Sequence, residues 1–359
     1  MMPCDDDKPA KGRPGIVGLD QLDQFDEVID ARSPGEYAED HIVGAINLPV
    51  LDDEERARVG TIYKQVSPFE AKRLGAALVS RNIARHLEGW LADKPKKYRP
   101  LVYCWRGGSR SGAMTHVLRS IGWQAAQLDG GYKDYRRAVI AELENWPERF
   151  RFTVVCGPTG VGKSRYLRAL DELGGQVLDL EKLAAHMGSV LGAYPTEAQP
   201  SQKQFESRIW SVMRRFDPAR PVFVESESRK IGKLHTPDHL LLRMREADCL
   251  SLEADIPVRV SLLKEEYAHF LSDPERLNRE LDRLIGLRGR ETVELWKRQV
   301  AAGRWDELVA ELLTNHYDPA YHRSLSHNFP QASRGPRFVL QSAAPDAISS
   351  LARQVLDAP

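Results

Sequence analysis

Cys104 is the residue whose surroundings in the sequence most favour nucleophilic chemistry. It follows an apolar run, 101–103, that predicts a buried strand, and it precedes a stretch with helical periodicity, 114–121. A helix N-terminus offers unpaired backbone N–H groups and the positive end of a dipole, so the thiolate form of Cys104 and an anionic substrate are both favoured there. A buried structural cysteine is the alternative, but it leaves the glycines and arginines of the loop unexplained. The candidate anion-binding residues of this loop are Arg106, Gly107, Gly108, Ser109 and Arg110.

A second chemical motif follows the apolar run 152–155 and matches the pattern G-x-x-x-x-G-K-[ST]. Backbone N–H groups of such a loop surround phosphate, the Lys163 ammonium reaches the terminal phosphate oxygens, and the Ser164 hydroxyl can bind Mg²⁺. We therefore predict a phosphate-binding loop. A nucleotide is its default ligand, although the loop itself recognises only phosphoryl groups. Its residues are Gly157, Thr159, Gly160, Val161, Gly162, Lys163 and Ser164.

Acidic residues at the ends of predicted strands are candidates to accompany the phosphate loop. Each of them also has the simpler interpretation of a solvated acid at a strand end. One histidine and one arginine near predicted strand ends are weaker candidates, because such residues are usually ordinary surface groups. The full set is Asp179, Glu181, Glu225, Glu227, His186 and Arg229.

An arginine-rich helical stretch leaves two interpretations open. It is either a solvated helix face or a surface that contacts RNA phosphates. Its basic residues, interspersed with acids, are Arg276, Arg279, Arg283, Arg288, Arg290, Lys297 and Arg298.

The elements that must position these residues alternate between strand and helix, which predicts α/β domains with parallel sheets. We expect a flexible tail (1–14), a first domain (15–146), and a second P-loop domain (147–359) with a helical region at about 264–325. The stretch 51–98 is expected to be largely helical. Predicted strands are 27–30, 101–103, 127–128, 151–156, 176–179, 221–225, 248–252 and 338–341.

Composition limits the function classes. The chain has 359 residues with 51 basic and 51 acidic side chains, so any RNA site must be a local basic patch. Its four cysteines lack metal-ligand spacing, which favours a reducing compartment without disulfides or a zinc site. No secretion signal or membrane-length apolar stretch is present in the sequence. We expect a cytoplasmic protein that acts as a monomer.

The first domain closely resembles the rhodanese domain. The resemblance implies that Cys104 is a persulfide-type carrier. The loop departs from the usual sulfurtransferase pattern, because Cys104 to Arg110 is C-x5-R, one residue longer, as in rhodanese-related phosphatases and arsenate reductases. A longer loop suits a larger anion. The matching residues are Asp30, Arg32, Glu36, Tyr37, His41, Ile42, Gly44, Ala45, Asn47, Pro49, the Cys104 loop, Gly130, Gly131 and Tyr132.

The combination of this domain with a C-terminal P-loop domain resembles the tRNA 2-selenouridine synthase family over nearly the whole chain. One departure is Met187, which stands where that family commonly has an arginine after its histidine. If that arginine binds phosphate, Arg229 or Lys230 must supply the charge here. Further matching stretches are 63–65, 71–76, 179–181, 186–189, 199–206, 224–228 and 316–319.

The resemblance implies that sulfur is replaced by selenium in wobble 2-thiouridine of tRNA. It also implies geranylation of that sulfur from geranyl diphosphate, and selenophosphate as selenium donor. Cys104 would attack the selenium and carry it, and Lys163 and Ser164 would neutralise the diphosphate leaving group. Partners would be the tRNA anticodon region and an enzyme that produces selenophosphate. Mg²⁺ and a nucleotide remain open as further ligands.

Two other classes of function remain as alternatives. The C-x5-R loop also fits a cysteine phosphatase or arsenate reductase fused to a kinase-like domain. A non-enzymatic regulator, in which the rhodanese fold senses a ligand for an NTPase, is the second alternative. Loss of aryl phosphatase activity on Cys104→Ser would favour the first, and RNA modification by the purified protein would exclude the second.

Overall fold

The computed structural model describes residues 15–189, 192 and 197–357, so the expected tail, 1–14, lies outside the described residues. The chain divides into two compact units, 1–141 and 142–359. The division falls inside helix α5 (Gly131–Asn145), slightly before the expected boundary after Trp146. Each unit has its own sheet and its own core.

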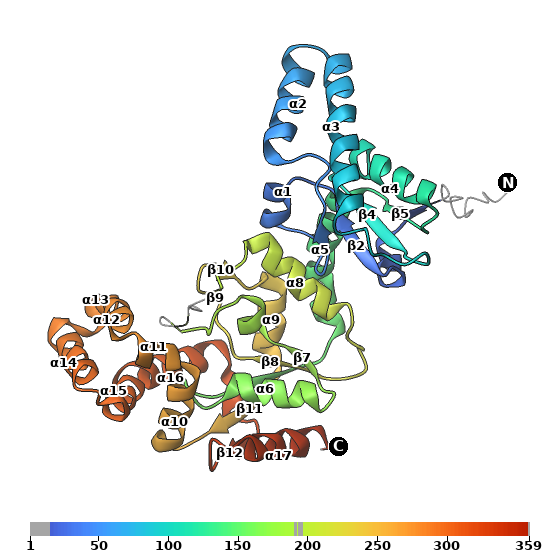
Figure 1. Cartoon of the computed structure of the whole chain (residues 1–359). Coiled ribbons are helices and arrows are strands. Elements are labelled where there is room, and N and C mark those ends of the chain that lie inside the picture. Colours follow the sequence, from blue (N-terminus) through green and yellow to red (C-terminus); the bar gives the residue numbers. More distant parts are fainter. Residues whose placement is uncertain (1–14, 190–191, 193–196, 358–359) are drawn as a thin grey trace, which may run out of the picture. The chain divides into compact units, whose positions relative to one another are not determined.

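The first unit contains a five-stranded parallel sheet in the order β1-β5-β4-β2-β3 (Figure 1). Strand β4 lies at its centre and is buried along its length. The predicted strands β2, β4 and β5 are confirmed, whereas β1 and β3 were not predicted because each has only two residues. The strands are β1 (Ile16–Val17), β2 (Glu27–Asp30), β3 (Ile46–Asn47), β4 (Pro100–Tyr103) and β5 (Ala126–Leu128).

Helices cover this sheet and fix the loop after β4. Ile83 of α3 and Met114 of α4 pack on Ile29 and Val102 of the sheet. The stretch 51–98 is largely helical, as predicted: it forms α2 and α3, and Gly89 caps α3 after Glu88. A helix after β5 was not expected. The helices are η1 (Leu19–Gln24), α1 (Pro34–Glu39), α2 (Asp53–Gln65), α3 (Pro68–Glu88), α4 (Ser109–Ile121) and α5 (Gly131–Asn145).

The second unit contains another five-stranded parallel sheet, in the order β12-β11-β6-β8-β7. All of its strands were predicted, with ends that differ by a few residues. An antiparallel hairpin, β9 (Lys230–Ile231) and β10 (Leu234–His235), was not predicted. The sheet strands are β6 (Phe152–Cys156), β7 (Gln176–Leu178), β8 (Val222–Glu225), β11 (Asp248–Glu253) and β12 (Arg337–Val339).

One face of this second sheet is covered by α6 and by the C-terminal helix α17, which the sequence patterns did not reveal. Tyr166 and Leu170 of α6 pack with Ile348 of α17 on Leu250 of β11. The helices around the sheet are η2 (Trp146–Arg149), α6 (Lys163–Glu172), α7 (Leu180–Leu183), α8 (Gln202–Met213), α9 (Asp238–Glu246), α10 (Ile256–Glu266) and α17 (Pro345–Leu356).

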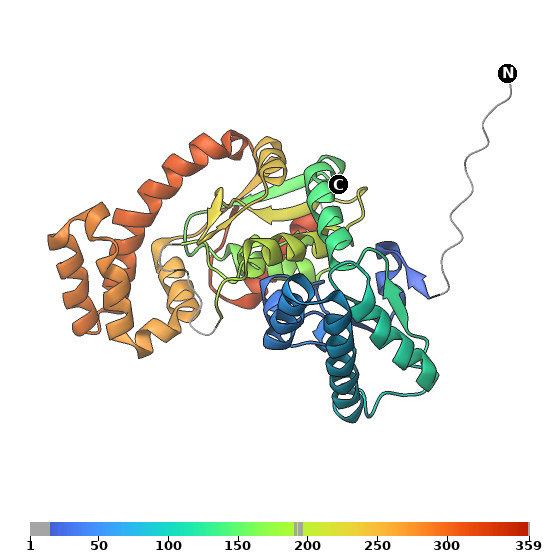
Figure 2. The same ribbon diagram turned by 90° about the horizontal axis from the view of Figure 1, so that it is seen from above.

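The predicted helical region forms a body of its own beside the second sheet, drawn in orange in Figure 2. Its core surrounds Trp296, which is fully buried among Leu277, Leu281 and Leu308. Within the described residues no helix has the length and apolar character needed to cross a membrane. The elements are α11 (Ala268–Ser272), α12 (Pro274–Asp282), α13 (Ile285–Arg288), α14 (Arg290–Ala301), α15 (Trp305–Leu312), η3 (Leu313–Tyr317), α16 (Asp318–Asn328) and η4 (Pro330–Ser333).

Candidate active sites

Cys104 lies directly after β4, buried at the start of the loop that leads into α4. The Ser111 hydroxyl donates a hydrogen bond to the Cys104 Sγ at 3.1 Å, and Gln127 Nε2 donates to Ser111 Oγ at 3.0 Å. These two hydrogen bonds fix the position of the Cys104 sulfur at the start of the loop, and neither Ser111 nor Gln127 was among the predicted site residues.

Glycines give the loop its shape. Gly107 has a φ of +61° and Gly131 a φ of +59°, conformations that other residues rarely adopt. A Cβ atom at Gly131 would lie 2.2 Å from the Cys104 carbonyl oxygen. The close approach lets Tyr132 N donate to that oxygen at 2.8 Å and Lys133 N donate to the Trp105 oxygen at 2.9 Å. The matched pair Gly130-Gly131 is thus needed to let α5 begin against the Cys104 loop.

The backbone N–H groups of the Cys104 loop are available to a ligand. Gly108 caps α4, and no protein acceptor is present within the described residues for the backbone N–H groups of 107–110. The two predicted arginines differ in role. Arg110 forms an ion pair with Glu36 at 2.8 Å, which also binds Arg56 at 3.0 Å, whereas Arg106 is exposed. Burial raises the Glu36 pKa, but the two arginines outweigh it and hold the pKa below its ordinary value. Arg106 and the loop backbone therefore offer positive charge to an anion.

A buried ion pair anchors the strand ends beneath this loop. Arg32 Nη2 lies 2.6 Å from Asp30 Oδ2, and both side chains are almost fully buried. Tyr103, the residue before Cys104, donates to Asp30 at 2.7 Å. The Arg32 guanidinium also stacks 4.0 Å from the ring centre of Tyr132. The matched residues Asp30, Arg32 and Tyr132 thus connect the end of β2 to both segments that form the loop.

The phosphate loop connects β6 to α6, as predicted, with positive φ at Gly160 (+78°) and Gly162 (+88°). Lys163 Nζ donates to the Gly157 carbonyl at 2.7 Å, so the lysine side chain folds back onto the first residue of the loop. Ser164 Oγ donates to Glu181 Oε2 at 2.9 Å. Lys163 and Ser164 therefore come together with one of the predicted carboxylates.

Two residues from distant parts of the sequence stabilise the phosphate loop by hydrogen bonds. Arg259 on α10 donates to the Thr159 carbonyl at 2.7 Å and forms an ion pair with Asp318 at 2.6 Å. The Gly157 N–H donates to the Tyr321 hydroxyl at 2.6 Å. Arg259 and Tyr321 were not predicted, because nothing in their local sequence indicates a distant loop.

The predicted carboxylates gather beside Ser164. Glu181 N donates to Glu225 Oε1 at 2.6 Å, and a Cβ atom at Gly188 would lie within 2.6 Å of both Glu181 and Glu227 oxygens. Burial and the neighbouring carboxylates raise the pKa of Glu225 well above its ordinary value. Burial and the Glu181 charge raise the pKa of Glu227 to about 8, against the opposing effect of Lys163. Such an acidic cluster favours a bound cation or protonation.

The other predicted carboxylate and histidine have structural roles. Asp179 caps α7 by accepting from Lys182 N at 2.8 Å, and burial raises its pKa. His186 is buried, accepts at Nδ1 from Gly188 N at 3.1 Å, and has a pKa lowered by burial. Both therefore shape the chain around the acidic cluster.

Arg229 does not join the site. Its side chain is 66% exposed and pairs with Asp238 at 3.3 Å, and within the described residues it makes no contact with the phosphate loop. Lys230 is exposed on β9. Neither residue therefore supplies the positive charge that an arginine at position 187 would provide. Lys163, in contrast, lies close enough to the acidic cluster to oppose the rise that burial causes in the pKa of Glu227.

Several arginines of the arginine-rich stretch form contacts with other residues of the same unit. Arg288 donates to His316 Nδ1 at 2.8 Å, Arg283 pairs with Glu280 at 2.6 Å, and Arg276 stacks on Phe270. These contacts favour the interpretation as a helix face of the protein over an RNA surface.

The Asp30–Arg32 pair generates a stability prediction. Asp30→Asn leaves the buried Arg32 charge uncompensated, so the free energy of unfolding should fall by about 3–5 kcal/mol. Glu70→Gln, which breaks the exposed Glu70–Arg73 pair on α3, should cost less than about 1 kcal/mol. Denaturant unfolding measures both variants, and equal losses would contradict the anchoring role.

The raised pKa of Glu227 generates a pH prediction. The folded protein holds a proton on Glu227 that the unfolded chain releases near pH 4.5, so ionisation opposes folding between about pH 5 and 8. Stability should fall with rising pH across this window, and Glu227→Gln should reduce that slope by at most about 1.4 kcal/mol per pH unit. Glu172→Gln, at an exposed site on α6, should leave the slope unchanged. Unfolding at several pH values tests this, and parallel slopes for wild type and Glu227→Gln would refute it.

Comparisons with known proteins find matches to both units of the chain. A family model described as "tRNA 2-selenouridine synthase AAA domain" matches residues 150–282, and one described as "Rhodanese-like domain" matches 18–138. A solved rhodanese-related protein from Thermoplasma volcanium is 16% identical, covers 34% of this chain and 89% of its own, and has a TM-score of 0.22.

Curated relatives match over both units. A tRNA 2-selenouridine synthase from Marinobacter nauticus is 32% identical, and the match covers 91% of this chain and 94% of that protein. One from Nitrosomonas europaea is 35% identical over 70% of this chain and 67% of its own length. One from Hydrogenovibrio crunogenus is 32% identical over 84% of this chain and 91% of its own. The chain therefore belongs to the tRNA 2-selenouridine synthase family.

Proposed function

We propose that this enzyme replaces sulfur by selenium in wobble 2-thiouridine of tRNA, with Cys104 as selenium carrier, selenophosphate as donor and geranyl diphosphate as co-substrate. The observation that carries the proposal is the placement of Cys104. Its sulfur accepts from Ser111 at the base of a loop whose backbone donors stay open to an anion. Family membership supplies tRNA as the substrate, and an unpaired anticodon base is accessible to such a site.

Selenium loading at Cys104 has a defined electron balance. When the thiolate attacks selenium, an S–Se bond forms, the Se–P bond breaks, and phosphorus leaves with the electron pair as phosphite. Arg106 and the N–H groups of the loop stabilise the departing oxyanion. When the carried selenium bonds to the base it is still attached to sulfur, so a thiol reductant must then cleave the S–Se bond, which leaves selenium on the base and returns Cys104 to its thiolate.

The C-x5-R length of the loop favours a second route that needs no reductant. Here the thiolate attacks phosphorus, an S–P bond forms, and the Se–P bond breaks to release hydrogen selenide beside the loop. Water then cleaves the S–P bond and releases phosphate. The two routes differ in what is attached to Cys104 and in the oxidation state of the phosphorus product.

Intact-mass and phosphorus NMR measurements on protein treated with selenophosphate test the role of Cys104. The wild type and a Cys249→Ser control should both gain one adduct per chain, and Cys104→Ser should gain none. Selenium on Cys104 with phosphite in solution supports the carrier route, and a phosphoryl adduct with phosphate supports the second. An adduct retained by Cys104→Ser would contradict both.

Geranylation of the 2-thiouridine sulfur requires a diphosphate leaving group to be stabilised. The sulfur attacks the first carbon of the geranyl chain, an S–C bond forms, the C–O bond breaks, and the base loses its N3 proton to solvent. Lys163 and the N–H groups of Gly160 and Gly162 are suited to neutralise the departing diphosphate. Selenium then displaces the geranylated sulfur at C2, and a geranyl thiolate leaves. No step of this sequence requires hydrolysis of a nucleotide.

Mg²⁺ fits the residues around the phosphate loop. Among the described residues, no group of three or more histidine, cysteine, aspartate or glutamate side chains is arranged to hold a metal by itself. Mg²⁺ commonly binds through one or two protein oxygens together with substrate phosphates. Ser164 and Glu181 offer such oxygens, and the Oε2 atom of Glu225 is buried without a hydrogen-bond partner within the described residues. When bound, the ion would add positive charge at the diphosphate.

The role of Lys163 is tested with purified protein, 2-thiouridine-containing tRNA and geranyl diphosphate. Lys163→Ala should slow geranylation by about 100-fold or more, because it removes the main cation at the leaving group. Lys233→Ala, at an exposed position between β9 and β10, should keep the wild-type rate. If Lys163→Ala abolished nucleotide binding and left geranylation untouched, the phosphate loop would serve a nucleotide instead.

An enzyme that produces selenophosphate is the partner implied by this chemistry, because selenophosphate must reach the Cys104 loop intact. Because the substrate is tRNA, we propose that the enzyme acts in the cytoplasm. We propose that a single copy of the chain suffices, since it contains both the cysteine loop and the phosphate loop.

A further inference from the structure

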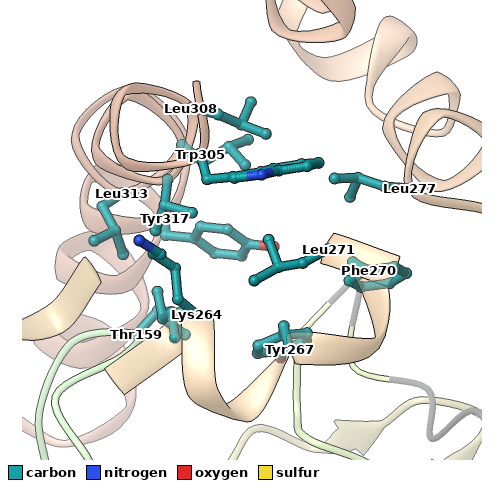
Figure 3. A pocket seen from close by; sticks show the side chains of 13 residues that line it. Thr159, Lys264, Tyr267, Phe270, Leu271, Leu277, Trp305, Leu308, Leu313 and Tyr317 are labelled. Atoms are coloured by element: carbon teal, nitrogen blue, oxygen red, sulfur yellow. The ribbon is translucent and has the colours of Figure 1, made fainter. Parts of the chain in front are cut away.

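An apolar pocket lies in the second unit between α10, α11, α12, α15 and η3 (Figure 3). Leucine and aromatic side chains form most of its wall. One lining residue, Thr159, belongs to the phosphate loop, whereas the others come from these helices and the turn between α10 and α11. The remaining lining residues are Leu263, Lys264, Tyr267, Phe270, Leu271, Leu277, Trp305, Leu308, Val309, Leu312, Leu313 and Tyr317.

The pocket and the phosphate loop share a wall. Arg259 of α10 holds the Thr159 carbonyl, so the side of the loop that carries Thr159 is fixed against that helix. Gly160 lies so close to Leu263 that an added Cβ atom would be 2.7 Å from its side chain. A ligand on the loop would therefore begin beside the apolar wall.

Two tyrosines connect the pocket to the acidic cluster. The rings of Tyr267 and Tyr317 line the pocket, and the Tyr267 hydroxyl lies 3.2 Å from Ser189 Oγ. Burial, with added repulsion from Tyr317, Glu181 and Glu266, raises the Tyr267 pKa. The hydroxyl of Tyr267 therefore points to Ser189, which is next to Gly188 at the acidic cluster, while its ring lines the pocket.

The lining favours a hydrocarbon over a nucleotide base. A base needs donors and acceptors along its edge, whereas the polar side chains that the described residues place in the wall are Thr159, Lys264, two phenols and the Trp305 indole. Lys264 is held at 2.6 Å by Asp306, so its charge is already paired. An apolar chain that leaves water for this wall gains affinity in proportion to its buried length.

We propose that this pocket binds the hydrocarbon chain of a prenyl diphosphate whose diphosphate lies on the phosphate loop. The inference rests on the proposed function and adds the residues that select the chain. Figure 3 places Leu277 and Trp305 across the pocket from Thr159, so these two side chains limit the length that fits.

Calorimetry on the full chain tests the proposal with inorganic diphosphate and with its dimethylallyl, geranyl and farnesyl esters. Affinity should rise with chain length, by up to about fourfold per buried methylene, until the pocket is filled. Geranyl diphosphate should then bind at least about 30-fold more tightly than inorganic diphosphate.

Leu271→Trp fills the pocket and should remove most of this gain while inorganic diphosphate binds as before. Leu287→Trp, at a 67% exposed position on α13, is the matched control and should behave as the wild type. Thermal unfolding of both variants confirms that each is folded. Leu277→Ala, which enlarges the pocket instead, should shift the preference towards the farnesyl ester.

Equal affinities for inorganic and geranyl diphosphate would overturn the pocket assignment, and so would a Leu271→Trp variant that loses ATP or GTP binding but keeps geranyl diphosphate. Neither result would contradict the proposed function, which the Lys163 experiment tests separately. If the wild type bound geranyl diphosphate through this pocket but did not geranylate tRNA, the proposed function would fail and the pocket assignment would stand.

Discussion

Parallel strands end at the same edge of a sheet, and both sites are built on such an edge. In the first unit, Asp30 ends β2, Cys104 follows β4 and Gly131 follows β5. In the second, the phosphate loop follows β6, Asp179 follows β7 and Glu225 ends β8. Each edge also meets a helix N-terminus, where backbone donors without partners attract an anion. The chain therefore contains two candidate anion sites that follow one physical rule.

The surroundings make the two sites chemically different. Around Cys104, the buried Asp30–Arg32 pair is internally neutral, so the loop keeps its positive potential for the oxyanion that selenophosphate releases. Around Ser164, the carboxyl groups of Glu181, Glu225 and Glu227 lie close together, and burial raises the pKa of Glu225 and Glu227, so Lys163 and a bound cation supply the positive charge that a diphosphate requires. The first arrangement suits transfer from selenophosphate, and the second suits the departure of a diphosphate beside an apolar pocket.

The sequence predicted what depends on local pattern. The strand–loop–helix context located Cys104 and Lys163, and strand-end acids located Glu181, Glu225 and Glu227. It did not predict Arg259 or Tyr321, because their partners, Thr159 and Gly157, lie 100 and 164 positions away. The short strands β1 and β3 and the helix α17 were missed because two residues carry no periodicity and because α17 is defined by its packing on α6. Arg229 was placed by proximity to a strand end, which does not fix where a long side chain points.

The most direct test of the central claim, that two anion sites act in sequence on one tRNA base, is mass spectrometry of tRNA from a deletion strain that expresses each variant. Wild type should restore 2-selenouridine, Cys104→Ser should accumulate geranylthiouridine, and Lys163→Ala should leave 2-thiouridine. Persistence of 2-selenouridine in the deletion strain, or identical nucleosides from both variants, would contradict it.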